Sequence, residues 1–303
     1  MSITASRITS SGTLFISGEF NEVTTSTIRL TTTTYYAAQF DEVSINGGAV
    51  AKRETNTGTL LVSNSFDEVT GMIVINGLLL QLDPGKVESF RSTSTSFIDI
   101  SGNTRNCSFI GAITYDLTSS SLLFDSPTIT ASNRISLSSL EGIDNTIYFT
   151  DGSEYSIEFW CKIASDAIQT YHSIAGRGST NPWIGIEKRA TDFRLFFRQL
   201  GGTYFYSTAI TTSVFTGWTQ VVFSVNANRD VRYYVNHAAG TFTDTNAVTT
   251  STFTINRLAS GYSSGGNFYS FDGNVGPINV YNKALSAAEI NNNFEALRDR
   301  YGI

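Results

Sequence analysis

Charged residues, prolines and cysteines are all scarce in this sequence. Asp, Glu, Lys and Arg make up 15% of the 303 residues, well below the usual quarter. The net charge is −6 and no basic run occurs, which argues against nucleic acid as a partner because phosphate binding requires clustered Lys and Arg. Only four prolines are present, and together with scattered glycines they leave no long linker of disordered composition.

Long apolar runs are also missing. The longest, MIVINGLLLQL (72–82), is interrupted by polar residues, so we expect no membrane insertion. The first residues, MSITASRITSSGTLF, lack the charged start and the apolar core of a secretory signal peptide. Cys107 and Cys161 are too few for a disulfide framework, and Cys161 is in step with apolar neighbours, which indicates a buried free thiol. Together these absences predict synthesis in a reducing cytoplasm.

What the sequence does contain is alternation with a period of two. Hydrophobic residues make up 41% of the chain and aromatic residues 13%, enough for a sizeable core. In YSIEFWCKI (155–163) and TDFRLFFRQL (191–200) apolar residues alternate with other residues, and WTQVVFSVN, RDVRYYVN and VGPINVYN follow at short intervals. Gly, Asn, Asp and Ser turn signals separate these segments. Many short strands at this spacing predict an all-β, antiparallel sandwich or jelly roll.

The end of the chain has the pattern of a helix. Ser286 is followed three residues later by Glu289, which is the spacing of a capping box. Apolar residues then recur at helical spacing: Ile290, Phe294, Leu297 and Tyr301. This stripe predicts one C-terminal helix that packs on the sandwich.

The first seventy residues contain a repeat. SGEFNEVT (17–24) returns as AAQFDEVS (37–44) and SNSFDEVT (63–70), and GTLFISGEFNEVT (12–24) aligns without a gap onto GTLLVSNSFDEVT (58–70). The Phe-(Asn/Asp)-Glu-Val tetrapeptide fits either a strand buried partly on both faces or a turn between strands, and the sequence does not choose between them. Repetition of this kind predicts a structural module, residues 1–72, that uses contacts with other chains because a small β unit cannot bury its own faces. The candidate assembly residues are Phe20, Glu22, Phe40, Glu42, Phe66 and Glu68.

From residue 74 onward the order of motifs resembles the laminin-G-like, concanavalin A-like jelly-roll domains. The resemblance rests on INGLLLQLDPGKVESF (75–90), SFIDISGNTRNCSFIGAITYD (96–116), SLLFDS (121–126) and, most specifically, the closing FDGNVGPINVYNKALSAAEI (271–290). It implies a jelly roll over residues 73–303. His237 stands where the family has a glycine after Asn236, and Ser126 replaces the glycine of the first Phe-Asp-Gly turn. These departures concern turns, where ligand sites of the family lie.

A domain of this kind headed by a short FDEV segment resembles virion structural proteins of tailed bacteriophages, especially those of cyanobacteria. The resemblance implies a fibre, neck or capsid-decoration element, made in the host cytoplasm and located in the virion. Its partners would be other virion proteins and further copies of the chain, with a trimer favoured by analogy with phage fibres. The alternatives are a cellular carbohydrate-binding module or adhesin domain, and, less favoured, a glycan hydrolase.

Catalytic and metal sites are not indicated by the sequence. Glycan hydrolases of the concanavalin A type need paired carboxylates on one strand face, and Glu158 stands alone between Ser156 and Trp160. GYSSG (261–265) lacks the strand-turn-helix setting of a nucleophile elbow. His172 and His237 lack ligands at metal spacing. We therefore expect neither an enzyme nor a cofactor; calcium stays open because four aspartates fall near predicted turns: Asp151, Asp192, Asp230 and Asp272.

Glycan binding is the sharper hypothesis. Exposed aromatic rings stack on sugar rings, and planar polar side chains bind the hydroxyls. The loop RGSTNPW (177–183) and two neighbouring predicted strands supply both kinds of side chain. The candidate ligand residues are Arg177, Asn181, Trp183, Arg194, Tyr204 and Tyr206. The other interpretation is a sheet face packed against a neighbouring subunit, because Tyr, Trp and Arg also mark protein interfaces.

Overall fold

The computed structural model describes the strands of the first seventy residues and most of the chain after them. The described ranges in that second part are 73–91, 94–126, 133–137, 144–167, 170–177, 182–243, 248–261 and 269–303. The chain divides into two compact units, Met1–Thr70 and Gly71–Ile303. Among the described residues, no helix has the length and apolarity to span a membrane.

The first unit contains a five-stranded antiparallel sheet with the order β1-β2-β5-β4-β3. Its strands are β1 (Thr4–Arg7), β2 (Thr13–Ser17), β3 (Glu42–Ile45), β4 (Ala49–Arg53) and β5 (Thr59–Ser63). The aligned segments GTLFIS and GTLLVS form β2 and β5, which pair with each other so that Phe15 is opposite Leu61. The hairpin β1–β2 is thus repeated as β4–β5. Glu42 begins β3, and the other five candidate assembly residues lie outside the described residues.

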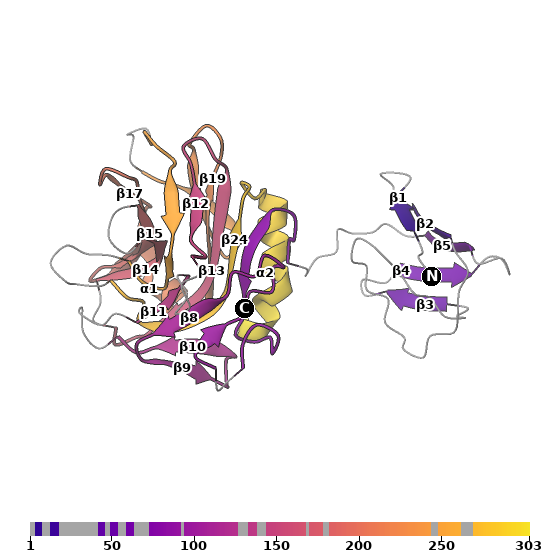
Figure 1. The fold of residues 1–303 in the computed structure, drawn as a ribbon, viewed down its shortest axis with the longest axis horizontal. Coiled ribbons are helices and arrows are strands. Elements are labelled where there is room, and N and C mark those ends of the chain that lie inside the picture. Colours follow the sequence, from indigo (N-terminus) through magenta and orange to yellow (C-terminus); the bar gives the residue numbers. More distant parts are fainter. Residues whose placement is uncertain are drawn as a thin grey trace. The chain divides into compact units, whose positions relative to one another are not determined.

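The second unit is a sandwich of two antiparallel sheets (Figure 1). The eight-stranded sheet has the order β21-β20-β19-β13-β24-β10-β9, and β6 pairs with β24. These strands are β6 (Leu78–Leu82), β9 (Ile113–Asp116), β10 (Ser121–Phe124), β13 (Tyr155–Ile163), β19 (Thr219–Val225), β20 (Val231–Val235), β21 (Ala238–Thr241) and β24 (Gly273–Tyr281). The antiparallel sandwich predicted from the alternation is confirmed.

The nine-stranded sheet has the order β17-β16-β15-β14-β23-β11-β8-β7, and β18 pairs with β16. These strands are β7 (Ser96–Phe97), β8 (Cys107–Ile110), β11 (Arg134–Ser136), β14 (Tyr171–Gly176), β15 (Trp183–Lys188), β16 (Asp192–Arg198), β17 (Tyr204–Tyr206), β18 (Ile210–Thr211) and β23 (Arg257–Leu258). A separate pair is formed by β12 (Ile147–Phe149) and β22 (Phe253–Ile255). A short helix that the sequence analysis did not predict, α1 (Thr212–Thr216), precedes β19.

The core lies between the two sheets and follows the alternation of the strands. In β13, Ile157, Phe159 and Cys161 are fully buried among residues of both sheets. Cys107 is buried as well, and both cysteines are free thiols. Burial raises the pKa of each thiol, so both stay protonated and unreactive at neutral pH. The prediction for Cys161 is confirmed.

The C-terminal helix α2 (Ala287–Tyr301) covers the outer face of the eight-stranded sheet (Figure 1). Its capping box is formed as predicted, with the Ser286 hydroxyl accepting from the Glu289 N–H and the Glu289 carboxylate accepting from the Ser286 N–H. Phe294 and Tyr301 stack on Trp160 of β13, at ring distances of 5.8 and 5.0 Å. Both faces of β13 are therefore buried, one by the second sheet and one by α2.

Candidate functional site

The outer face of the nine-stranded sheet brings three of the six predicted glycan-binding residues together with Arg198. Phe193, Leu195 and Phe197 of β16 point into the core, so the alternation places Arg194, Phe196 and Arg198 on the opposite face. In β17, Phe205 is a core residue and its neighbours Tyr204 and Tyr206 share the outer face. We call the set Arg194, Arg198, Tyr204 and Tyr206 the tyrosine–arginine ladder.

The ladder is ordered by contacts between planar groups. The rings of Tyr204 and Tyr206 are stacked, 5.7 Å apart with an interplanar angle of 6°. The Arg194 guanidinium lies 4.0 Å from the centre of the Tyr206 ring, and that of Arg198 lies 4.8 Å from the Tyr204 ring. Arg198 is directly opposite Tyr204 in the β16–β17 pairing. Each guanidinium thus gains a cation–π contact while the tyrosines stay half-buried.

A carboxylate completes the ladder on the next strand. Glu187 of β15 accepts two hydrogen bonds from Arg194, at 2.8 Å from Nε and 2.6 Å from Nη2. Burial raises the pKa of the Tyr206 phenol, and the negative charge of Glu187 raises it further. Both phenols therefore keep their protons at neutral pH and can donate as well as accept hydrogen bonds. The sequence analysis missed Glu187. It is four residues after Trp183, so the period of two places both on the same face of the strand.

Trp183 differs from its prediction. It was expected in a loop with an exposed ring, but it is the first residue of β15 and is 1% exposed. Its indole stacks on Tyr269 at 5.5 Å and contacts Phe196 edge to face at 4.5 Å. The backbone of Gly261 lies under the indole so closely that a Cβ there would meet it at 2.8 Å. Trp183 lies on the same outer face, opposite Arg198, but Tyr269 covers its ring, so it cannot stack on a ligand.

The remaining candidates lie apart from the ladder or outside the described residues. Arg177 follows the last residue of β14 and is exposed, and Asn181 falls outside the described residues. Gly261 is the one described residue of the GYSSG segment. The roles of Arg177 and Asn181 in ligand binding stay predictions.

The carboxylate of Glu158 is fully buried beneath α2. It accepts hydrogen bonds from Trp160 Nε1 (3.2 Å), Gln220 Nε2 (2.8 Å), Asn279 Nδ2 (3.1 Å) and Asn293 Nδ2 (2.6 Å). Burial raises its pKa, although these four donors act in the opposite direction. Because the Glu158 carboxylate is enclosed between the sheet and α2, its role is structural.

The four aspartates considered for calcium lie in separate surroundings. Asp151 forms an exposed ion pair with Arg229, and hydrogen bonds from Arg229 and from the Ser251 N–H hold the pKa of its carboxyl well below the usual range. Asp192 begins β16 and pairs with Arg189 at 3.3 Å. Asp230 accepts from the Asn226 amide, and the N–H of Asp272 donates to His172 Nδ1. Within the described part of the chain, no group of three or more His, Cys, Asp and Glu has metal-binding geometry.

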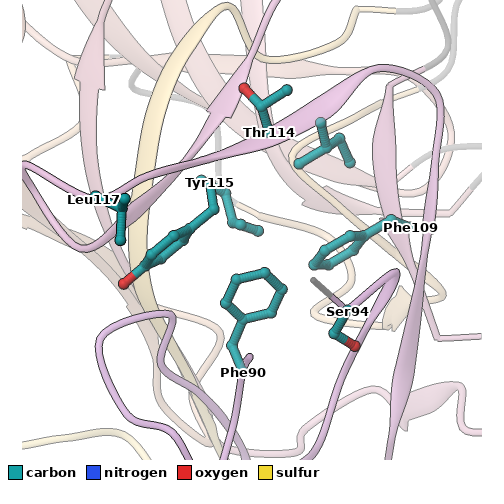
Figure 2. Close-up of a pocket in the computed structure, with 8 residues that line it drawn as sticks. Phe90, Ser94, Phe109, Thr114, Tyr115 and Leu117 are labelled. Carbon is teal, nitrogen blue, oxygen red and sulfur yellow. The ribbon is translucent and has the colours of Figure 1, made fainter. Parts of the chain in front are cut away.

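An apolar pocket of about 370 Å³ opens near the β9 edge of the sandwich. Figure 2 shows Phe90, Phe109 and Tyr115 around it, with Leu117 at one side. The rings of Phe90 and Tyr115 are 5.1 Å apart. No charged side chain lines this pocket, and Ser94, Thr114 and Tyr115 are its polar residues.

A family comparison agrees with this architecture. The sequence model of the concanavalin A-like lectin/glucanases superfamily matches residues 132–291. A search of curated proteins finds no match. Among solved structures, domain 4 of AbnA, a GH43 extracellular arabinanase from Geobacillus stearothermophilus in complex with arabinotriose, is similar at 16% identity with a TM-score of 0.45, covering 71% of this chain and 96% of that domain.

Binding domains of botulinum neurotoxins are also similar in structure. The serotype D binding domain is 14% identical with a TM-score of 0.48, and the alignment covers 73% of this chain. The receptor binding domain of the C/D mosaic serotype is 13% identical with a TM-score of 0.47. The chain spans about half the length of each of these toxin domains, 52% in both cases.

Proposed function

This chain belongs to the concanavalin A-like lectin/glucanases superfamily, and on that premise we propose that its second unit is a non-catalytic carbohydrate-binding domain. The family description includes both lectins and glucanases, so the residues have to decide between binding and cleavage. Glu158 is sealed beneath α2, and Glu187 is held in an ion pair with Arg194. Neither carboxylate is placed as a free acid or nucleophile, which favours binding.

The tyrosine–arginine ladder is the observation that carries the proposal. It offers half-buried aromatic rings, two guanidinium groups and a carboxylate on one face of a rigid sheet. Rings of this kind stack on the C–H face of a sugar, and the charged groups bind its hydroxyls. Because strand pairing already fixes the rings, binding costs little additional side-chain entropy.

A glycan array with the full-length protein tests this proposal. We expect binding to at least one glycan class, and we expect the double variant Tyr204→Ala/Tyr206→Ala to lose at least about tenfold in affinity because two central aromatic contacts are removed. Leu123→Ala, an exposed change on β10 of the other sheet, is the matched control and should bind normally. A blank array, together with a change in solution mass of the double variant, would instead identify the ladder as a subunit contact.

For the whole protein we propose a structural role in the virion of a tailed bacteriophage, as a fibre, neck or capsid-decoration element. The support is the resemblance of the FDEV-headed domain and the repeated hairpins of the first unit, which suit attachment to other chains. Mass spectrometry of purified, nuclease-treated phage particles should detect peptides of both units. Peptides found in the cell envelope of the producing organism, and absent from particles, would favour a cellular adhesin.

A further inference from the structure

A second concave site lies in the jelly-roll unit and shares no residue with the tyrosine–arginine ladder. It is a pocket of about 570 Å³, a volume within the range of small-molecule sites. It is lined by Leu79 and β12 and, for the larger part, by polar residues, among them Arg105, Tyr148, Glu154 and Asn282. A ligand that fits there must therefore carry several hydrogen-bonding groups.

Tyr148 gives this pocket an exposed aromatic ring. The alternation of β12 buries Ile147 and Phe149 in the core and leaves Tyr148 62% exposed. Its hydroxyl donates to Asp144 Oδ2 at 3.2 Å, which restrains the ring. Asp144 is itself held by the Thr146 N–H at 2.9 Å. A large exposed ring restrained in this way is suited to stacking at low entropic cost.

Arg105 gives the pocket a cation whose hydrogen-bonding capacity is mostly unused. Its backbone N–H donates to Asp99 Oδ2 at 2.9 Å, which fixes the main chain. Its side chain makes a long 3.4 Å contact from Nη1 to the Asn145 carbonyl, and within the described residues Nε has no partner. Placing a guanidinium in a half-buried position without an anion is unfavourable, so this position favours an anionic ligand group.

The other polar groups determine what else the ligand must carry. Glu154 is exposed and accepts hydrogen bonds only, while Asn282 is exposed and can both donate and accept. A ligand with negative charge throughout would be repelled by Glu154. The pocket is therefore suited to a molecule with one anionic group, an apolar face and several hydroxyls.

We infer that this pocket binds a sugar residue that carries a carboxylate, an inference that rests on the proposed carbohydrate-binding function. The carboxylate pairs with the two terminal nitrogens of the Arg105 guanidinium, because Nε is itself buried. The C–H face of the sugar lies on Tyr148, and its hydroxyls bind Glu154 and Asn282. Both uronic acids and sialic acids have this chemistry.

Titration of the full-length protein with three free sugars tests the inference: glucuronic acid, N-acetylneuraminic acid and neutral glucose, followed by ligand-observed NMR. We expect at least one acid to bind about tenfold or more tightly than glucose, since hydrogen bonds to charged groups are strong, and the preferred acid identifies the source. Arg105→Met should bind that acid and glucose equally. Tyr148→Ala, at an exposed position, should weaken both.

Leu123→Ala, an exposed change on β10, is the matched control and should keep the preference for the acid. If neither acid is preferred over glucose, or if Arg105→Met retains the preference, the inference is wrong. A protein that still binds array glycans through the ladder would then leave the proposed function standing. Loss of all sugar binding, at both sites, would overturn the function and the inference together.

Discussion

At the scale of single residues, Glu158 is the least expected group in the molecule. Its carboxylate is surrounded by neutral donors only, from β13, β19, β24 and α2. In addition, Asn279 Oδ1 has no partner among the described residues. Burial raises the pKa of the carboxyl and outweighs the four donors, which act in the opposite direction.

The raised pKa has a consequence for stability. In the unfolded chain a Glu titrates near pH 4.3, roughly, so the contribution of Glu158 is fully present below that pH and is lost as the pH rises through its folded pKa. We expect the free energy of unfolding of the wild type, relative to that of Glu158→Gln, to fall as the pH rises above about 4.3 and through the raised folded-state pKa. Urea denaturation at several pH values measures this difference, and parallel curves would contradict the expectation.

The pKa of Glu289 is shifted in the opposite direction to that of Glu158. Burial raises the pKa of its carboxyl, but the Lys283 ammonium and the hydrogen bonds of Ser286 outweigh burial and lower it. A lowered pKa stabilises the protein above the unfolded value, and that stabilisation is lost as the pH falls through the folded pKa. Glu289→Gln should therefore be less stable than the wild type at neutral pH, with the difference vanishing in acid.

At the scale of elements, α2 is docked by its ends as well as by its apolar stripe. The capping box fixes its first turn, and the rings of Trp160 and Trp218 contact Tyr301 in its last turn at 5.0 and 4.1 Å. In between, Asn293 donates to Glu158 and to the Tyr281 hydroxyl. A helix held at so many points should be lost only together with the sheet beneath it.

Removal of the cap tests this coupling. We expect Ser286→Ala to lower the free energy of unfolding of the whole unit by about 1 kcal/mol, because the Glu289 N–H loses its acceptor. Ser286→Asp keeps an acceptor at the same position and should restore most of the loss. Urea denaturation followed by tryptophan fluorescence reports the unit through Trp160 and Trp218. A separate early transition for α2 alone would show that the helix is not coupled to the sheet.

The sequence predicts a structural feature well when neighbouring residues determine that feature, and poorly when residues far along the chain determine it. The alternation of YSIEFWCKI correctly separates Ile157 and Phe159 from Glu158, because side-chain direction in a strand is a local property. It does not reveal that α2 covers Glu158, since the helix lies more than a hundred residues further along the chain. Trp183 was expected in the loop RGSTNPW (177–183). Its burial depends on Tyr269, which no local pattern connects to it.

At the scale of the whole molecule, the two units differ in how the faces and edges of their sheets are covered. The second unit has a core between two sheets and a helix on one of them. The first has a single five-stranded sheet in which β1 is an edge strand. Such an edge presents unpaired backbone groups to any neighbouring strand. The first unit is therefore the one expected to need a partner.

Solution mass distinguishes the roles of the two units. We expect the full-length protein to form an oligomer, with a trimer favoured, and a truncated protein that starts at Gly71 to be a monomer. Light scattering of both proteins at the same concentration measures this. If the full-length protein is also a monomer, the repeats would have to bind a different protein, as a decoration subunit does. If both are oligomers, the contact lies in the jelly-roll unit.

The start of the jelly-roll unit also determines how it bears mechanical load. The Val74 N–H donates to Asn293 Oδ1 of α2 at 2.7 Å, and the Asn282 N–H donates to the Gly77 carbonyl at 2.8 Å. The β6–β24 pairs follow, beginning with Leu78 opposite Tyr281. Tension applied at residue 71 would reach these bonds one after another, before the remaining strand pairs of the two sheets. The unit would thus yield first at β6 and α2, while the outer face of β14–β17 keeps its shape under force.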